Sequence, residues 1–304
     1  MRARLNEAIS LLRTDDPKRV GEAIALLQGT VFAFSMKVCG HHEDAEDTMQ
    51  EVLFRSLPYL RKIDNPRALA VWLYTVTRNR CWRSRRKSSF APKQMLSLDE
   101  LMPDRDELQR LLQDRSPGPE ASTVRGEEAQ LLHKAVLQLP PPYRIVLVLH
   151  DMEELDTDLV AQILNLQPGT VRVRLHRARL AVRKILARLL DGHTRSSLAE
   201  ETVLQEDRPR RERAKAGRRD PQCRAIFANL SEYLDRQLDQ AACKRMQHHM
   251  ETCPACVLFL NDLSSAIDRC RQFEAPQNSR VEARLGSLLV QEYLRLAEHS
   301  PRRP

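Results

Sequence analysis

Glycine is scarce in this sequence of 304 residues, which contains nine glycines where average usage would give about 20. Aromatic residues account for only 5% of the chain. The longest unbroken apolar run, residues 68–74, is far shorter than the ~20 residues that cross a bilayer, and the first residues lack the apolar stretch of a signal peptide. These shortages exclude a collagen-like chain, and we expect a helical, cytoplasmic protein with no membrane partner.

What the chain does contain is charge and enough apolar residues for compact cores. It has 49 Lys+Arg against 41 Asp+Glu, a formal net charge of +8, and 42% hydrophobic residues. Its length suggests two or three domains. We predict an all-α, multi-domain protein of helical bundles, divided into a helical domain over 1–90, an acidic linker over 91–124, a helical domain over 125–192, a basic linker over 193–220, a Cys/His domain over 221–274 and a C-terminal helix and tail over 275–304.

Residues 154–179 have the pattern of a helix-turn-helix. Asp156 or Thr157 can cap the first helix, Asn165 tolerates the left-handed conformation of a sharp turn, and Pro168 suits the first turn of the second helix. We expect an inward apolar face made of Leu159, Val160, Ile163, Leu164, Val171, Leu175 and Ala178. Two short helices joined by a tight turn match the geometry that places a recognition helix in the DNA major groove.

The second helix of this motif is rich in arginine, and we expect its basic residues to stay outside. The residues expected to contact DNA are Thr170, Arg172, Arg174, His176, Arg177 and Arg179. A helical hairpin with a solvated basic face is the alternative, and the pattern does not distinguish the residues that read bases from those that hold phosphates.

The first domain combines an acidic helix with a later aromatic and basic stretch. Residues 44–55 form a helix with an acidic exposed face, and Trp72, Leu73, Val76 and Cys81 are expected to pack inward. The aromatic and basic residues over 72–86 also suit single-stranded DNA, where bases stack on aromatics and cations follow the backbone. Core packing of the aromatics and plain solvation of the acidic face are the competing interpretations.

These segments resemble the extracytoplasmic-function (ECF) sigma factors of bacterial RNA polymerase. Asp44-Ala-Glu-Asp47 with Gln50-Glu51, and Ala70-Val-Trp-Leu-Tyr74 with Arg78-Asn79, resemble region 2; residues 137–147 followed by 169–179 resemble region 4. The resemblance implies promoter DNA and core RNA polymerase as partners. It assigns polymerase docking to Asp47, Gln50 and Glu51, and the −35 element to the six residues of the second helix. It assigns the −10 element to Trp72, Arg78, Asn79, Trp82, Arg83, Arg85 and Arg86.

Five of the seven cysteines lie between positions 223 and 270. His249, Cys253 and Cys256 have an H-x3-C-x2-C spacing that can direct one imidazole and two thiolates at one centre, and Cys223 can supply the fourth ligand of a tetrahedral zinc site. Cys243 could replace Cys223, and His248 could replace His249. The segment resembles the zinc-binding anti-sigma domain, and separate buried cysteines with a surface histidine are the alternative.

No catalytic constellation is visible in the sequence, so we expect a non-enzymatic initiation factor. Our hypothesis is that residues 221–274 contact regions 2 and 4 and regulate the chain in cis, because a tethered domain meets its target at high effective concentration. A permissive C-terminal domain is an equally serious alternative. For the whole chain, a stand-alone helix-turn-helix regulator and an anti-sigma-type interaction protein are the competing interpretations.

The amphipathic stretch 279–296 is expected to dock within the chain through Val281, Leu285, Leu288, Leu289 and Leu296.

Overall fold

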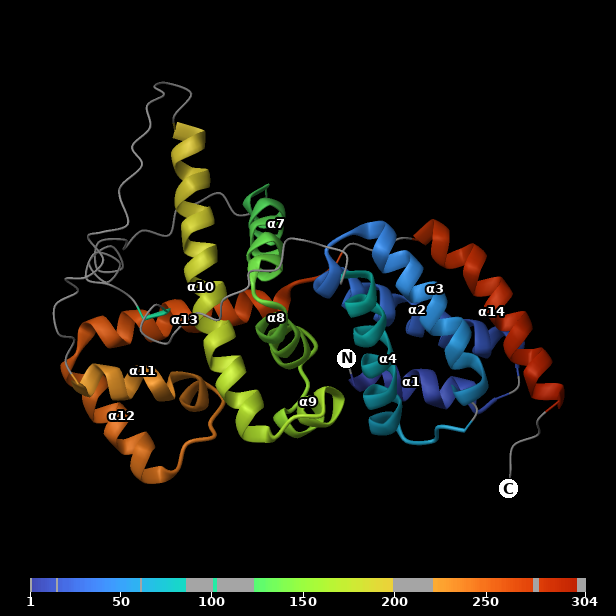
Figure 1. Cartoon of the computed structure of the whole chain (residues 1–304), viewed down its shortest axis with the longest axis horizontal. Helices are drawn as coiled ribbons and strands as arrows, with labels where there is room; N and C mark the ends of the chain where they lie inside the picture. The colour runs from blue at the N-terminus through green and yellow to red at the C-terminus, as the bar shows by residue number, and fades with distance from the viewer. Residues whose placement is uncertain are drawn as a thin grey trace. The chain divides into compact units, whose positions relative to one another are not determined.

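The computed structural model describes residues 2–14, 16–60, 62–85, 101–102, 123–198, 221–275 and 279–299, and the regular elements in these ranges are all helical. The all-α prediction is therefore confirmed for the described residues (Figure 1). The elements are α1 (Arg2–Leu12), α2 (Pro17–Cys39), α3 (His42–Leu60), α4 (Pro66–Arg85), α7 (Thr123–Gln138), α8 (Pro141–Leu147), the π-helical η1 (Val148–Met152), α9 (Thr157–Leu164), α10 (Pro168–Leu198), α11 (Pro221–Leu234), α12 (Gln240–Thr252), α13 (Pro254–Gln272) and α14 (Ser279–His299).

The chain divides into two compact units that are not continuous in sequence. The first unit contains residues 1–91, 144–171 and 271–304, and the second contains residues 92–143 and 172–270. Each unit thus combines segments that the sequence pattern assigned to separate domains. Most of the two expected linkers, 91–124 and 193–220, lies outside the described residues.

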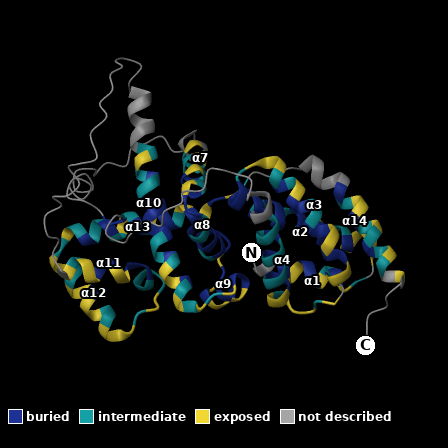
Figure 2. Cartoon of the chain, viewed as in Figure 1, coloured by how far each residue is buried: buried dark blue, intermediate teal, exposed yellow. Residues whose placement is uncertain are grey.

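Helix α2 forms the centre of the first unit. Asp16 caps its N-terminus and Gly40 ends it in the left-handed conformation, with φ of 80°. By length and composition α2 is apolar enough to cross a membrane, but 72% of its most apolar window is buried, as in the core helix of a bundle. Helices α1, α3 and α4 pack around it, and its buried surface is visible in Figure 2.

The C-terminal helix α14 packs on α2 and α3 within this unit. Its buried side chains include Leu285, Leu289 and Tyr293, and the Tyr293 hydroxyl donates to the Leu12 carbonyl oxygen at 3.2 Å. Intramolecular docking of this helix is therefore confirmed, but Leu288 is 52% exposed and its expected place in the docking face is wrong.

The second unit contains a small bundle of α11, α12 and α13. Its core includes Leu230, Met246, Leu263 and the rings of Phe227 and Phe259, which pack edge to face with centroids 4.8 Å apart. This bundle positions the cysteine and histidine side chains described next.

Candidate metal centre and recognition helix

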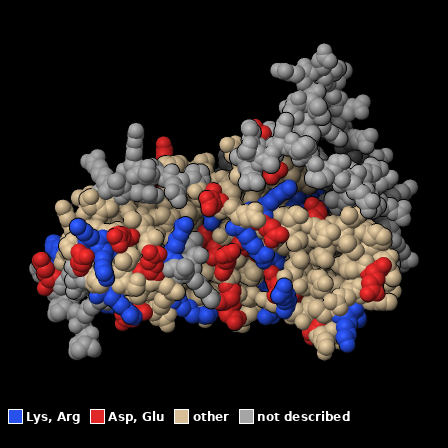
Figure 3. Space-filling model, turned by 180° about the vertical axis from the view of Figure 1, so that it is seen from behind, with Lys and Arg blue, Asp and Glu red and all other residues tan. Residues whose placement is uncertain are grey.

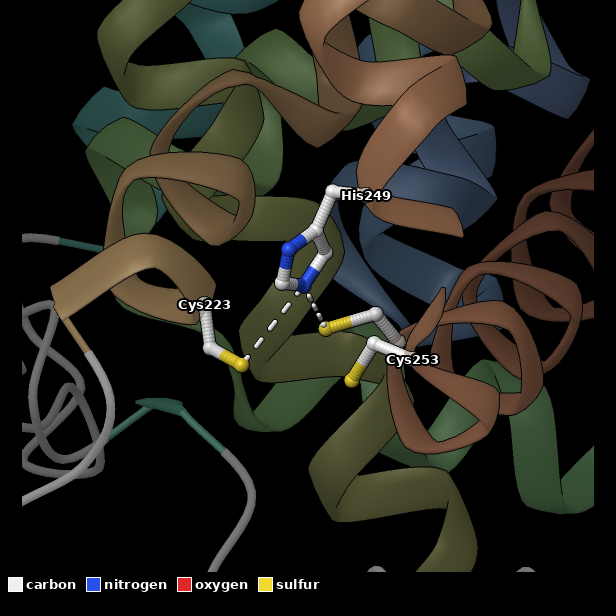
Figure 4. A group of neighbouring side chains, drawn as sticks. Cys223, His249 and Cys253 are labelled. Carbon is white, nitrogen blue, oxygen red and sulfur yellow. Dashed lines mark hydrogen bonds between the residues drawn. The ribbon is translucent and has the colours of Figure 1, made fainter. Parts of the chain in front are cut away.

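Four side chains of the second unit converge on one point. The ligand atoms of Cys223, His249, Cys253 and Cys256 all lie within 4.8 Å of one another. His249 Nε2 is 3.6 Å from the Cys223 sulfur and 3.3 Å from the Cys256 sulfur, so the imidazole points between two thiols (Figure 4). The structure thus brings together the four residues predicted as metal ligands.

Three helix ends create this convergence. Cys223 lies in the first turn of α11, His249 in the last turn of α12, and Cys256 in the first turn of α13. Cys253 is the C-cap of α12, where its backbone N–H donates to the His249 carbonyl oxygen. Pro254 begins α13 directly afterwards, which suits a residue without a backbone N–H at a helix start.

The geometry fits a tetrahedral zinc ion. Ligands held about 2.0–2.3 Å from zinc stand about 3.3–3.8 Å apart, which matches the two nitrogen–sulfur distances. Burial raises the pKa of the Cys256 thiol, and the neighbouring Cys253 and Cys223 raise it further, so a thiolate there needs a cation to compensate it. The alternative ligand His248 is 83% exposed and lies 3.5 Å from Glu251, and Cys243 is not in the cluster.

The helix-turn-helix forms as its turn chemistry predicts. Asp156, rather than Thr157, is the N-cap of α9, and its carboxylate accepts from the Leu159 N–H at 2.8 Å. Asn165 ends α9 in the left-handed conformation, with φ and ψ both 53°. Pro168 begins α10, and the predicted inward residues of both helices are buried.

One stripe of α10 contacts the Cys/His domain instead of solvent. Arg179 is 0% exposed, and its guanidinium donates to both carboxylate oxygens of Asp235 at 2.8 and 2.9 Å. Such bidentate, charge-assisted pairs are among the strongest hydrogen bonds in proteins. The expectation that Arg179 stays outside is therefore wrong, because Asp235 follows α11, far from Arg179 in sequence.

Three more side chains extend this stripe. Arg172 donates to Gln237 at 3.2 Å, and the Nδ1 of His176 lies 2.9 Å from the Ser231 hydroxyl. Arg183 pairs with Asp262, and its guanidinium carbon lies 4.3 Å from the Phe259 ring centroid. Arg183 was not among the predicted site residues, although it continues the helical spacing of Arg172, His176 and Arg179.

The burial of His176 changes its proton affinity. Desolvation lowers the pKa of His176 to about 4, and the neighbouring Arg179 and Arg177 contribute to this decrease. The Nε2 of this ring is buried without a hydrogen-bond partner. The contact with the Cys/His domain therefore favours the neutral imidazole.

The other predicted DNA-contacting residues of α10 lie outside this stripe. Thr170, Arg174 and Arg177 are half-buried, and Arg177 donates to the Tyr143 hydroxyl at 3.4 Å. Val173, on the same helix, is 54% exposed.

In the first unit, the residues predicted to dock on polymerase lie on α3. Asp47 is exposed, and Gln50 and Glu51 are half-buried. Glu51 is paired with Arg80 and, at 2.9 Å, with Arg55. The predicted docking face is thus available only in part.

The residues predicted to handle the −10 element lie on or near α4. Trp72 is half-buried and packs against Tyr59, with ring centroids 5.6 Å apart. Arg78 donates to its neighbour Asn79 and, at 2.9 Å, to the Ile163 carbonyl oxygen. The expected inward packing holds for Leu73 and Cys81, whereas Trp72 and Val76 are only half-buried. The side chains of Trp82, Arg83 and Arg85, and Arg86 as a whole, lie outside the described residues.

A groove of about 590 Å³ opens between α3 and α4 of this unit. Its lining includes Tyr59, Trp72 and the two arginines Arg55 and Arg80. Tyr59 is 52% exposed and was missed because its spacing on α3 belongs to no basic or aromatic run. On the face in Figure 3, the described basic and acidic side chains are intermixed.

Three protein-family models match separate stretches of the chain. The model for sigma-70 region 2 matches residues 24–90, the model for sigma-70 region 4 matches residues 129–182, and a zinc-finger family model matches residues 223–256. The chain thus contains sigma-70 region 2 and region 4 domains, followed by an anti-sigma-like zinc-finger domain. Sigma factors are non-enzymatic initiation factors, which confirms the prediction of a protein without enzymatic activity.

The relatives of this chain are ECF sigma factors. The chain is 28% identical over 188 residues to the ECF RNA polymerase sigma factor SigW of Bacillus subtilis, covering 61% of this chain and 98% of SigW. It is 29% identical over 160 residues to the ECF sigma factor SigE of Mycolicibacterium smegmatis, covering 52% of this chain and 58% of SigE. It is 28% identical over 157 residues to the RNA polymerase sigma-H factor of Pseudomonas aeruginosa, covering 49% and 76%.

Proposed function

We propose that this chain recruits bacterial core RNA polymerase to promoters and that its zinc-finger domain inhibits it in cis. Polymerase docks on α3 through Asp47, Gln50 and Glu51. The α4 residues, with Trp72 central, handle the melted −10 element, and α10 reads the −35 element. The chain acts in the cytoplasm, where it meets core polymerase.

The burial of Arg179 carries the proposal of inhibition. A guanidinium that gives two hydrogen bonds to Asp235 cannot give the same bonds to a base edge or a phosphate. His176 and Arg172 are engaged with Ser231 and Gln237 in the same stripe. Three of the six residues assigned to the −35 element are thus in contact with the domain after region 4.

The partners of these basic residues imitate the chemistry of DNA. Asp235 and Asp262 offer carboxylates to Arg179 and Arg183, as phosphates do to arginines in protein–DNA complexes. Competition for the same donors favours inhibition over the permissive alternative, since a permissive domain would leave the DNA-contacting face free.

Zinc would hold the inhibitory domain together. Cys223, His249, Cys253 and Cys256 would be its four ligands, and a fully ligated ion of this kind supplies folding energy rather than catalysis. Because the ligands come from α11, α12 and α13, the ion would fix the helix that precedes Asp235.

The test is in vitro transcription by bacterial core polymerase on linear templates with randomised −35 and −10 hexamers. The Asp235→Asn variant of the full chain is compared with wild type, and Glu232→Gln in the last turn of α11 serves as the charge-matched control. We expect Asp235→Asn to raise transcript yield about five- to tenfold and Glu232→Gln to leave it unchanged.

Different results would support the competing interpretations. A fall in yield with Asp235→Asn would identify a permissive domain. DNA binding without core polymerase would identify a stand-alone helix-turn-helix regulator. The absence of core-dependent transcription in every variant would identify an anti-sigma-type interaction protein.

A further inference from the structure

A charged pair is buried in the first unit, where region 2 meets residues 144–171 of region 4. Lys37 Nζ lies 2.7 Å from Glu153 Oε1, and the two side chains are 5% and 0% exposed. The Tyr74 hydroxyl donates to the other carboxylate oxygen of Glu153 at 2.9 Å, and Lys37 also donates to the Met152 carbonyl oxygen at 3.3 Å. Lys37, Glu153 and Tyr74 form one polar network, to which both regions contribute.

The backbone before Glu153 leaves the regular helix at this point. The Glu153 N–H donates to the carbonyl oxygen of Val148, five residues earlier, at the end of the π-helical η1. Glu154 follows with a φ of 54°, which a non-glycine residue rarely adopts. A π-helical turn often marks a functional position, and here it presents the Glu153 carboxylate to α2 and α4.

The network favours one arrangement of the two regions over slightly displaced ones. Burial raises the pKa of Tyr74, and the Glu153 carboxylate raises it further, so the phenol keeps the proton that it donates. A buried ion pair adds little stability relative to an apolar pair, but one charge left without its partner is strongly unfavourable. Full separation of the regions, in contrast, hydrates both charges.

The same interface holds α9 against α4. Arg78 Nη1 and the Thr75 hydroxyl both donate to the Ile163 carbonyl oxygen, at 2.9 and 3.4 Å. The −35 and −10 elements are about 25 base pairs apart, or about 85 Å of duplex at about 3.4 Å per base pair. Since α4 and α9 are in contact within the first unit, region 2 and this part of region 4 lie much closer together than the two promoter elements.

We propose that Lys37, Glu153 and Tyr74 form a lock that holds region 2 and region 4 in a closed arrangement unable to span a promoter. The functional consequence rests on the proposed sigma function. The lock itself is made only of residues in regions 2 and 4, so it acts without any contact from the zinc-finger domain.

The test compares full-length variants in three measurements: hydrogen exchange over residues 148–156 and α4, radius of gyration by small-angle X-ray scattering, and transcription from the randomised template pool. Glu153→Gln removes the carboxylate, and Tyr74→Phe removes only the hydroxyl. The double variant Lys37→Met/Glu153→Leu replaces the pair by apolar side chains. Glu292→Gln, which removes one partner of an exposed pair with Arg295 on α14 at 2.8 Å and lies outside the network, is the control.

We expect Glu153→Gln to speed exchange in both segments and raise transcription about tenfold, with a larger radius of gyration. Tyr74→Phe should act in the same direction by about threefold. The double variant and Glu292→Gln should stay near wild type, because neither leaves a buried charge without a partner. If Glu153→Gln lowers helix content, Tyr74→Phe and the double variant decide the question.

The lock and the sigma function can fail separately. Faster exchange and expansion in Glu153→Gln and Tyr74→Phe, with no transcription from any variant, would retain the lock and reject the sigma function. Transcription by wild type, with exchange and dimensions equal in all variants, would overturn the lock.

Discussion

The two units join regions of the chain by opposite means. In the second unit, α10 meets the zinc-finger domain through hydrogen bonds and ion pairs, with Arg179 and Asp235 at the centre. In the first unit, α14 packs on α2 and α3 through buried side chains such as Leu289 and Tyr293, and the charged Lys37–Glu153 pair is enclosed.

This difference indicates which of the two contacts DNA could displace, the polar contact of α10 or the enclosed contacts of the first unit. Phosphates offer arginines the same kind of acceptor that Asp235 and Asp262 offer, so under the proposed function promoter DNA would compete directly for α10. Nothing on a DNA backbone replaces a buried apolar face or the enclosed Glu153 carboxylate. DNA therefore cannot open the first unit by competing for its hydrogen-bond donors. Under the proposed function, docking of core polymerase would supply the binding energy for that opening.

Loss of a metal ligand should have the largest effect, and that effect should be confined to the second unit. We expect Cys256→Ser to weaken zinc binding at least about 100-fold and to loosen α11, α12 and α13, because zinc binding and folding are coupled in such sites. Zinc affinity is measured by competition with a chromophoric chelator, and helix opening by hydrogen exchange.

Cys243→Ser is the matched control, since Cys243 lies in α12 outside the cluster. Exchange over residues 148–156 of the first unit should remain unchanged in both variants. Equal zinc affinity for Cys256→Ser and Cys243→Ser would show that the four residues do not hold the ion.

Acidification should weaken the contact between α10 and the zinc-finger domain in the second unit. The pKa of His176 is lowered to about 4 by burial and by Arg179 and Arg177, against an ordinary value of about 6.5. The released helix therefore binds the proton more tightly than the docked helix. The stabilisation is complete above about pH 6.5 and is lost as the pH falls from there toward 4.

The measurement is an NMR titration of the His176 ring, assigned by comparison with His176→Gln. The ring faces Ser231, with Asp235 held by Arg179 beside it. We expect His176 to titrate below pH 6 in the full chain and closer to 6.5 in Asp235→Asn. An unchanged value in Asp235→Asn would mean that the docked contact does not control this ring.

Removing one helix cap from each unit should have the smallest effect on stability, and it tests whether the two units unfold separately. Asp156 accepts from the Leu159 N–H at 2.8 Å in the first unit, and Asp239 accepts from the Ala242 N–H at 2.7 Å in the second. Each change to Ala should lower stability by about 1 kcal/mol. Thermal unfolding should show two transitions, one shifted by Asp156→Ala and the other by Asp239→Ala. A single transition shifted by both variants would contradict separate unfolding of the two units.

Local chemistry made much of this architecture predictable. Asn165 at the turn, Asp156 before α9 and Pro168 at the start of α10 act through neighbours within a few residues. The spacing of His249, Cys253 and Cys256 likewise encodes a helix end and a tight turn. In each case the sequence interval already determines the geometry.

Contacts between distant segments could not be predicted in the same way. Arg179 is buried by Asp235, 56 positions away, and Glu153 pairs with Lys37 from 116 positions away. No local period identifies such partners. Leu288 shows the same limit, since the helical period predicted it on the docking face and it is 52% exposed.

The arginine stripe of α10 also has an evolutionary consequence. Under the proposed function, Arg179 and His176 would serve both promoter choice and self-restraint, so a substitution that redirects the chain to new genes would also alter its resting activity. Such a change can persist only with a matching change at Asp235 or Ser231. Target repertoire and background output are therefore inherited as one trait.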